Sequence, residues 1–133
     1  MKKEKVTIYF CGNPLMKEDS LPFELVPMLE KHFQEKIKFV HHDPNDNLPV
    51  LNRIFILDVV INTIDVITIE NEKQLETESI YSAHDWDLAF NLKLLLKMNK
   101  LKSFFIIGIP PSGDVDKIKK DVIAIIDKNV LTI

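Results

Sequence analysis

Short apolar segments alternate with longer amphipathic ones along the chain, and this alternation predicts the secondary structure. Three segments are nearly continuous in β-branched, aromatic and other apolar residues: 6–11, 53–61 and 103–111. Continuous apolar strands are typical of a sheet that is covered on both faces. Segment 37–42 has a similar but more mixed composition, and 65–71 alternates apolar and polar side chains as a half-exposed edge strand does. These five segments are the expected strands.

Three longer segments follow the helical period, with apolar residues three and four positions apart. They run from about Pro22 to Phe33, from 82 to 99 and from 115 to 129. Pro22 suits a first helical turn, because its missing amide has no partner there, whereas Pro27 should kink that helix or shift its start. The helix within 82–99 should be buried on a wide face, because its apolar residues form more than one stripe. They are Trp86, Ala89, Phe90, Leu92, Leu94, Leu96 and Met98.

The order of these elements is β-α-β-β-β-α-β-α, with a polar connection over 72–79. Buried strands that alternate with helices predict an α/β fold: a three-layer α/β/α sandwich with a mostly parallel central sheet of about five strands. In such sheets ligands bind beyond the carboxyl ends of the strands. The segments that follow each strand are therefore where functional residues are expected.

Composition excludes several classes of protein. The chain has 133 residues, of which 46% are apolar and 28% charged, so we expect one globular domain over 1–133. The apolar runs are too short to span a bilayer and no secretory signal is visible, which favours a cytoplasmic protein without a membrane partner. A net charge of −3 without a basic block argues against nucleic acid. The one cysteine, Cys11, excludes an internal disulfide or a multi-cysteine zinc site, and at the end of a buried strand it is expected to be inert.

Three polar residues lie where the predicted topology brings chain segments to one edge of the sheet. Asp19 lies in the loop after the first strand, Asp58 near the carboxyl end of the third, and His84 opens the helix before the last strand. All three can reach one crevice. Two carboxylates and an imidazole suit a divalent transition metal such as nickel or zinc. Asp19, Asp58 and His84 are therefore candidate metal ligands.

Each of these residues also has a structural explanation. Asp19, taken alone, is better explained as a cap of the following helix, and a single histidine such as His84 at a helix start is more often structural. For Asp58 the two explanations are balanced, because an acid in a buried strand is costly unless it is paired, metal-bound or at the strand end. The dense run His-His-Asp at 41–43 is expected in a solvent-exposed turn, with neighbouring side chains on opposite faces.

Four stretches, in order, resemble the hydrogenase maturation endopeptidases, which process the large subunit of nickel-iron hydrogenases. Residues 11–30 have the family's strand followed by Gly-Asn, an apolar pair, two acids and a helix. Residues 55–60 resemble its strand that ends in an aspartate, and 82–95 its histidine at the start of a long helix. Residues 104–113 resemble its late strand running into Gly-x-x-Pro. The match covers nearly the whole chain with similar spacings.

The resemblance implies a function and roles for the candidate residues. Asp19, Asp58 and His84 would contact metal, and Asp19 and Asp58 would be the catalytic carboxylates, with Glu18 a solvated neighbour. The metal would be the nickel of the substrate, met transiently, with no cofactor bound permanently. The protein, expected to be a monomer, would dock on the nickel-loaded hydrogenase large-subunit precursor and remove a short carboxy-terminal peptide. The nickel would polarise the scissile carbonyl or a water molecule.

The chain departs from the family pattern in three ways. Most members have a glycine-rich turn after the second strand, whereas residues 41–49 contain an aspartate-proline sequence closer to the branch that serves archaeal deazaflavin-reducing hydrogenases. Pro22 stands where the family has a glycine, and most of the helix between the second and third strands is missing. The last two differences alter the expected substrate cleft, so a relative that has lost cleavage is also compatible with the sequence.

Two further functions stay open on the sequence. A non-catalytic metal-binding assembly chaperone of the same fold would bind the precursor or nickel and leave the tail intact. The chain has no clear nucleophile–base pair, which fits a chaperone and a metal-dependent protease equally. A small-ligand binding domain is the third, although neither GxGxxG nor GxxxxGK[ST] occurs, which argues against nucleotides.

Overall fold

The computed structural model describes residues 5–43, 46, 48–49, 52–61, 63–76 and 86–131. It has five strands, four α-helices and two short 3₁₀ turns in the described part of the chain. In chain order they are β1 Val6–Phe10, the turn η1 Lys17–Asp19, α1 Leu21–Phe33, the turn η2 Gln34–Lys36, β2 Ile37–His41, β3 Arg53–Val59, β4 Ile67–Ile69, α2 Glu72–Glu76, α3 Trp86–Lys97, β5 Ser103–Ile109 and α4 Val115–Asn129.

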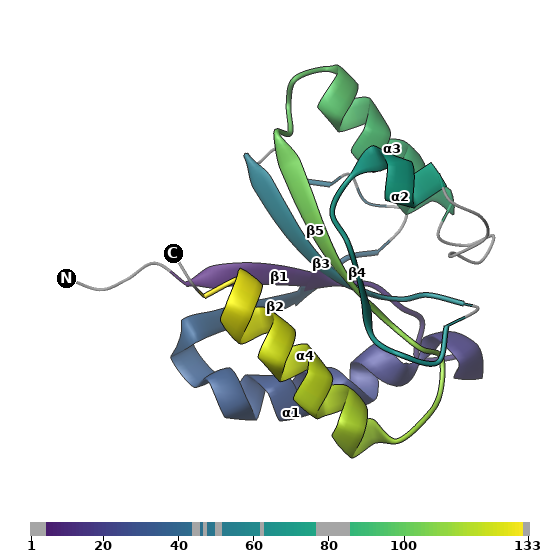
Figure 1. Cartoon of the computed structure of the whole chain (residues 1–133), viewed down its shortest axis with the longest axis vertical. Coiled ribbons are helices and arrows are strands. Elements are labelled where there is room, and N and C mark those ends of the chain that lie inside the picture. Colours follow the sequence, from purple (N-terminus) through teal and green to yellow (C-terminus); the bar gives the residue numbers. More distant parts are fainter. Residues whose placement is uncertain are drawn as a thin grey trace.

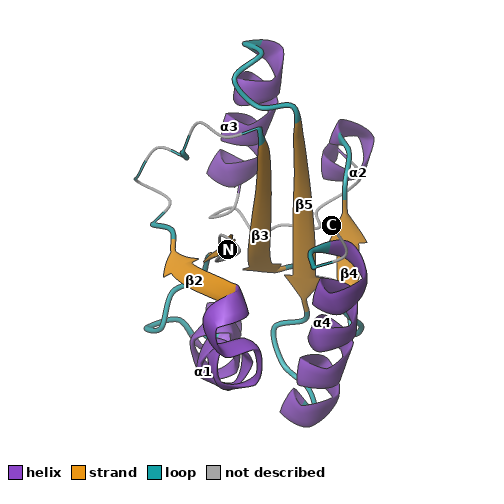
Figure 2. Ribbon diagram, turned by 90° about the vertical axis from the view of Figure 1, so that its left-hand side faces the viewer, coloured by secondary structure: helices purple, strands orange, loops and turns teal. Residues whose placement is uncertain are grey.

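The strands form one sheet in the order β2-β1-β3-β5-β4. β2, β1, β3 and β5 run parallel, and only β4 is antiparallel to its neighbour β5. The three continuous apolar segments thus occupy the inner positions, and Figure 2 shows β3 and β5 at the centre of the molecule. The prediction of a mostly parallel sheet with β4 as an edge strand is confirmed, although β4 is shorter than the segment 65–71.

Helices cover both faces of the sheet, which confirms the three-layer α/β/α architecture. α1 and α4 lie side by side on one face, and α3 and α2 lie on the other (Figure 1). The first apolar core, on the α1/α4 face, contains Ile8, Leu25, Leu29, Val122 and Ile126 among others. The second core, on the α3 face, contains Ile54, Ile56, Ala89, Leu92 and Ile106 among others.

Two expectations concerned the prolines of α1. Pro22 lies in the first turn, as predicted. Pro27 does not shift the start of the helix, which begins at Leu21 and continues without a break to Phe33. Pro27 is exposed. Its ring therefore faces solvent, and the apolar side of the helix, formed by residues such as Leu25 and Leu29, stays packed on the sheet.

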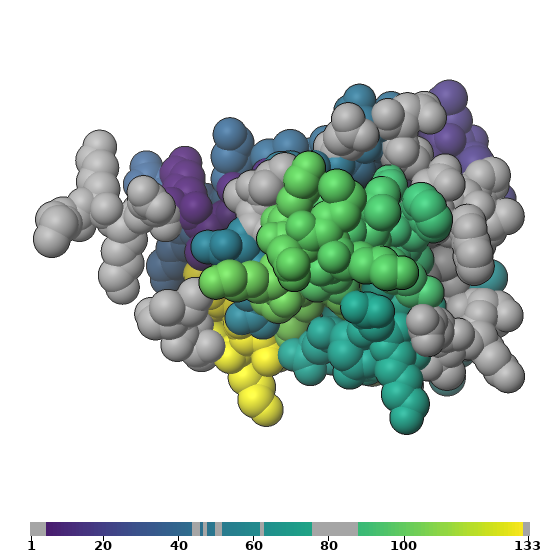
Figure 3. All heavy atoms as spheres, turned by 90° about the horizontal axis from the view of Figure 1, so that it is seen from above, coloured from purple at the N-terminus to yellow at the C-terminus, as the bar shows by residue number. Residues whose placement is uncertain are grey.

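The prediction that α3 is buried on a wide face is wrong. Ala89 and Leu92 are buried and Leu96 packs partly against the same core, which is one helical stripe. The other apolar stripe remains exposed: Phe90 is 58%, Leu94 44% and Met98 51% accessible. Figure 3 shows α3 and the turn after it, in green, at the centre of the face seen from above. The sheet can accept only the side of α3 that faces it.

The short helix α2 was not expected in the polar segment 72–79. Local side chains explain it. The Asn71 carboxamide oxygen accepts from the backbone N–H of Gln74, and the Gln74 carboxamide oxygen accepts from the N–H of Glu70. One side of the helix carries Leu75, which is buried in the α3-face core. Within the described residues no helix is long and apolar enough to cross a bilayer.

Candidate active site

Asp58 is a buried acid near the carboxyl end of β3. Its side chain has 0% accessibility, and its Oδ1 accepts a hydrogen bond from the N–H of Val59 at 2.8 Å. Leu57 and Val59 belong to the core on the α1/α4 face. Because side chains alternate along a strand, the Asp58 carboxylate lies on the α3 face. Its partner in the ladder is Gly108 of β5, where a Cβ would come within 2.9 Å of Val60.

Asp19 ends the 3₁₀ turn that follows β1, and the loop is folded back onto it. The N–H of Asn13 donates to the Asp19 carbonyl oxygen at 2.9 Å, and the Asp19 N–H donates to Met16 O at 2.9 Å. Gly12 has a φ of +147°, and a Cβ there would lie 2.7 Å from the same Asp19 oxygen. The N-cap of α1 is Ser20, so Asp19 does not occupy the capping position that its sequence suggested.

The loop of Asp19 and the strand of Asp58 are neighbours at one edge of the sheet. The N–H of Cys11 donates to Leu57 O at 2.9 Å, which extends the β1–β3 pairing and brings Cys11 beside Asp58. Two residues further on, Asn13 holds Asp19. Asp19 therefore lies in the loop after β1, and Asp58 near the carboxyl end of the adjacent strand β3, as the topology predicted.

His84, the third expected ligand, lies outside the described residues, and α3 is described from Trp86 onward. Within the described ranges no three histidine, cysteine, aspartate or glutamate side chains are grouped to hold a metal ion. Two of the three expected ligands, Asp19 and Asp58, belong to that part of the chain. The three-residue metal site therefore stays a prediction.

His42 is buried rather than exposed, so the expectation of a solvent-exposed turn is wrong for it. Its N–H donates to Phe10 O at 2.9 Å, which continues the pairing of β2 with β1 for one more residue and leaves His42 only 7% accessible. Burial lowers the pKa of its imidazole; Asp46 and Asp43 oppose this shift, and His41 adds to it. The neutral imidazole is therefore favoured in the folded protein.

The extended pairing places His42, Cys11 and Asp58 in one row across three adjacent strands, at the carboxyl edge. All three are buried, and Cys11 belongs to the core on the α3 face, as its expected role as an inert residue requires. Sequence reasoning took these residues one strand at a time. The signal that was available is their place near the carboxyl ends of three parallel strands.

His41 contacts the start of the loop that carries Asp19, on the α1/α4 face of the sheet. Its Nε2 lies 3.3 Å from the carbonyl oxygen of Gly12. Its ring packs against Phe10 of β1 and Phe23 of α1, with centroid distances of 5.3 and 5.0 Å. The first residues of the loop are thus fixed by strand β2 as well as by their own hydrogen bonds, a role that the sequence alone did not reveal.

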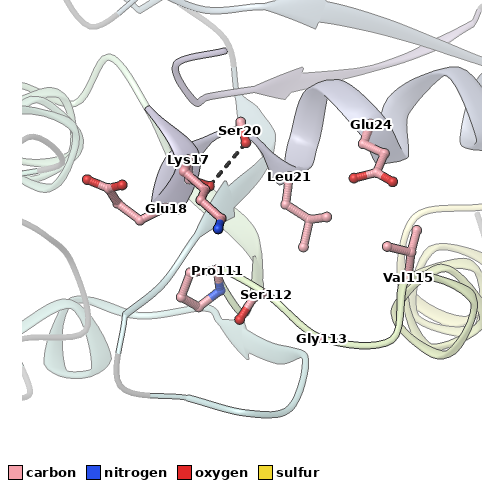
Figure 4. A pocket seen from close by; sticks show the side chains of 9 residues that line it. All are labelled: Lys17, Glu18, Ser20, Leu21, Glu24, Pro111, Ser112, Gly113 and Val115. Atoms are coloured by element: carbon pink, nitrogen blue, oxygen red, sulfur yellow. Dashed lines mark hydrogen bonds between the residues drawn. The ribbon is translucent and has the colours of Figure 1, made fainter. Parts of the chain in front are cut away.

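A groove of about 400 Å³ adjoins this edge, between the loop after β1 and the loop after β5. Figure 4 shows the two segments facing each other across it. Asp19 lies between two of its lining residues, Glu18 and Ser20, but is not itself part of the lining. The lining residues are Lys17, Glu18, Ser20, Leu21, Glu24, Pro111, Ser112, Gly113 and Val115.

Two solved structures are similar to this fold over nearly its whole length. One is the hydrogenase maturating endopeptidase HybD from Escherichia coli, with a TM-score of 0.66, 14% identity, and coverage of 95% of this chain and 94% of that chain. The other is the solution structure of an endopeptidase from Escherichia coli, with a TM-score of 0.64, 14% identity, and coverage of 94% and 95%. No protein-family model and no curated protein sequence matches the chain. At this identity the likeness shows the fold.

Proposed function

We propose that this protein is an endopeptidase that removes a short carboxy-terminal peptide from the nickel-loaded large-subunit precursor of a nickel-iron hydrogenase. The observation that carries the proposal is the pair of acids at the carboxyl edge. Asp58 is buried at the end of β3, and the loop of Asp19 is hydrogen-bonded beside it. The likeness to a structure named as a hydrogenase maturating endopeptidase supports the same function.

The chemistry of these residues suits contact with a metal carried by the substrate. A carboxylate in an apolar surrounding favours a cation strongly, because water competes little for either charge. Asp58 has that environment, and its Oδ1 is oriented by the Val59 N–H at 2.8 Å. Asp19 is only partly buried, and Gly12 and Asn13 fix the backbone that carries it. In the proposal His84 completes the set.

In this function the reaction is hydrolysis of one peptide bond. The oxygen of a water molecule bonds to the scissile carbonyl carbon, the C–N bond breaks, and a proton passes to the leaving amine. The substrate's nickel supplies polarisation of the carbonyl or of the water. Asp19, Asp58 and His84 hold the precursor through that nickel, so a precursor without nickel lacks the bridge. Nickel insertion is thereby checked before the tail is removed.

The test is incubation of the purified protein with nickel-loaded and nickel-free hydrogenase precursor, read by the mass of the large subunit. We expect cleavage of the loaded form alone. Asp58→Asn and His84→Ala should lower its rate by at least about 100-fold. Asp127→Asn, which changes an exposed carboxylate on α4, is the matched control and should cleave normally.

Two outcomes would overturn parts of the proposal. Equal cleavage of both precursor forms would remove the role of nickel. Tight binding of the loaded precursor with an intact tail would instead identify a non-catalytic assembly chaperone. Co-sedimentation of the protein with the precursor, measured in the same samples, separates that outcome from a failure to bind.

A further inference from the structure

The groove beside Asp19 has an apolar floor and a charged rim. Figure 4 shows Leu21 pointing into the space between the two loops, with Pro111 on one side of it and Val115 on the other. Leu21 is buried, and Pro111 and Val115 are half-buried. Lys17, Glu18 and Glu24 on the upper rim are exposed. An open groove with apolar residues at its base and charged residues at its rim suits an extended chain with alternating apolar and polar side chains.

The acids of the rim have no cationic partner among the described residues. Within the described part of the chain, the carboxylates of Glu18 and Glu24 have no hydrogen bond or ion pair. Lys117 on α4 is already engaged, because its Nζ lies 3.1 Å from Asp121 and 3.6 Å from Asp65. The end of the groove at Glu24 is thus available to a cation from outside.

An anionic ligand is less suited, although α1 and α4 both begin at the groove. A helix N-terminus carries about half a positive charge and favours anions. Here acids already offset it: Glu24 lies in the first turn of α1, and Asp116 in the first turn of α4. The Asp114 side chain accepts hydrogen bonds from the N–H groups of Asp116 and Lys117 at 3.1 and 3.4 Å. Lys17 is the one basic residue in the lining.

We propose that this groove binds an extended segment of the protein substrate, with a basic side chain of that segment beside Glu24 and an apolar one on Leu21 and Val115. The inference rests on the proposed function, because the segment is then the precursor tail that reaches the edge at Asp19. Glu24 is a specificity residue: it selects a lysine or arginine in the tail and takes no part in the bond cleavage.

A binding experiment on the isolated protein tests the groove without any cleavage. The probes are two capped pentapeptides of alanine and valine that differ only at the centre, one with arginine and one with glutamate. Backbone amide signals are followed by NMR at millimolar peptide. We expect the arginine peptide to shift the signals of Leu21, Ser112, Gly113 and Val115, and to bind about 3- to 5-fold more tightly than the glutamate peptide at low salt.

Glu24→Gln should remove most of that preference and retain the shifts, because the apolar floor is unchanged. Glu30→Gln, which changes an exposed acid on the same helix outside the groove, should keep the preference. Equal binding of both peptides, or shifts elsewhere on the surface, would overturn the inference.

The two proposals fail in distinguishable ways. If the arginine peptide binds in the groove but the nickel-loaded precursor stays intact, the groove stands and the endopeptidase falls. If the precursor is cut and Glu24→Gln leaves KM unchanged while the peptides do not bind, the groove falls and the endopeptidase stands. If both the groove and the endopeptidase proposals hold, Glu24→Gln raises KM about 3- to 5-fold and leaves kcat nearly unchanged.

Discussion

The loops after β1 and β5 have the same place in the fold but use their acids differently. Each leaves the carboxyl end of an inner strand, contains a glycine with φ near +145°, and leads into a helix on the same face. In the β5–α4 loop, Asp114 is the N-cap, and its carboxylate accepts from two N–H groups of α4. In the β1–α1 loop the N-cap is Ser20, which makes no side-chain capping bond.

The difference separates a structural acid from a candidate functional one. The Asp114 carboxylate caps its own helix, α4, which is a structural role. Asp19 is placed one residue before the cap, and the loop fixes it through its backbone, with Asn13 donating to its carbonyl oxygen. Helix α1 begins without a carboxylate cap, and the acid that could have capped it stands at the sheet edge beside the strand of Asp58. The proposed metal-contacting role of Asp19 is compatible with this placement.

The largest expected effect is the difference in cleavage rate between variants of Asp19 and of Asp114. Asp19→Ala should reduce cleavage of the nickel-loaded precursor by about 100-fold or more, because a proposed ligand of the reacting group is lost. Asp114→Ala should leave the rate per folded molecule unchanged. Rates are compared by mass spectrometry at a temperature where circular dichroism shows both variants folded. Equal losses of rate would erase the distinction between the two loops.

An intermediate effect is expected for the two glycines. Gly12→Ala and Gly113→Ala share the backbone strain of a positive φ, which costs about 1–3 kcal/mol. Gly12→Ala also forces a Cβ to 2.7 Å from Asp19 O, whereas the Cβ at Gly113 meets only Ile118 at 3.5 Å. Urea unfolding should therefore show Gly12→Ala as the less stable variant by about 1 kcal/mol or more. Identical free energies of unfolding for the two variants would contradict this expectation, because the β1–α1 loop would then accommodate a Cβ at residue 12 without further loss of stability.

The smallest effect concerns the two helix caps. Asp114→Ala should lower the free energy of unfolding by about 1 kcal/mol, because it removes the capping bonds of α4. Ser20→Ala should cost less than about half of that, since the Ser20 hydroxyl donates to Lys17 O at 3.1 Å and caps no N–H of α1. Thermal unfolding of the two variants decides the order. A larger loss for Ser20→Ala would show that α1 depends on its cap after all.

The sequence by itself determined the fold class and the edge at which function was expected. Short, continuous apolar segments rich in β-branched and aromatic residues, such as β3 and β5, favour covered strands, and their alternation with helices leaves few topologies. It also placed Asp19 after the first strand and Asp58 near the end of the third, at the edge where parallel strands end together. The helical period over 115–129 predicted a helix with the bounds that α4 has, Val115–Asn129.

Only the tertiary structure decided which polar residues are buried and which apolar ones are exposed. Periodicity counts the stripes of a helix but not the surfaces available to receive them, so the exposed stripe of α3 was predicted as buried. The burial of His42 depends on one further hydrogen bond to Phe10 of another strand. The capping residue of α1 depends on how the loop folds back through Gly12 onto Asp19. The exposure of the α3 stripe and the burial of His42 depend on segments far apart in the chain, and the cap of α1 depends on the three-dimensional path of one loop; local sequence patterns encode neither.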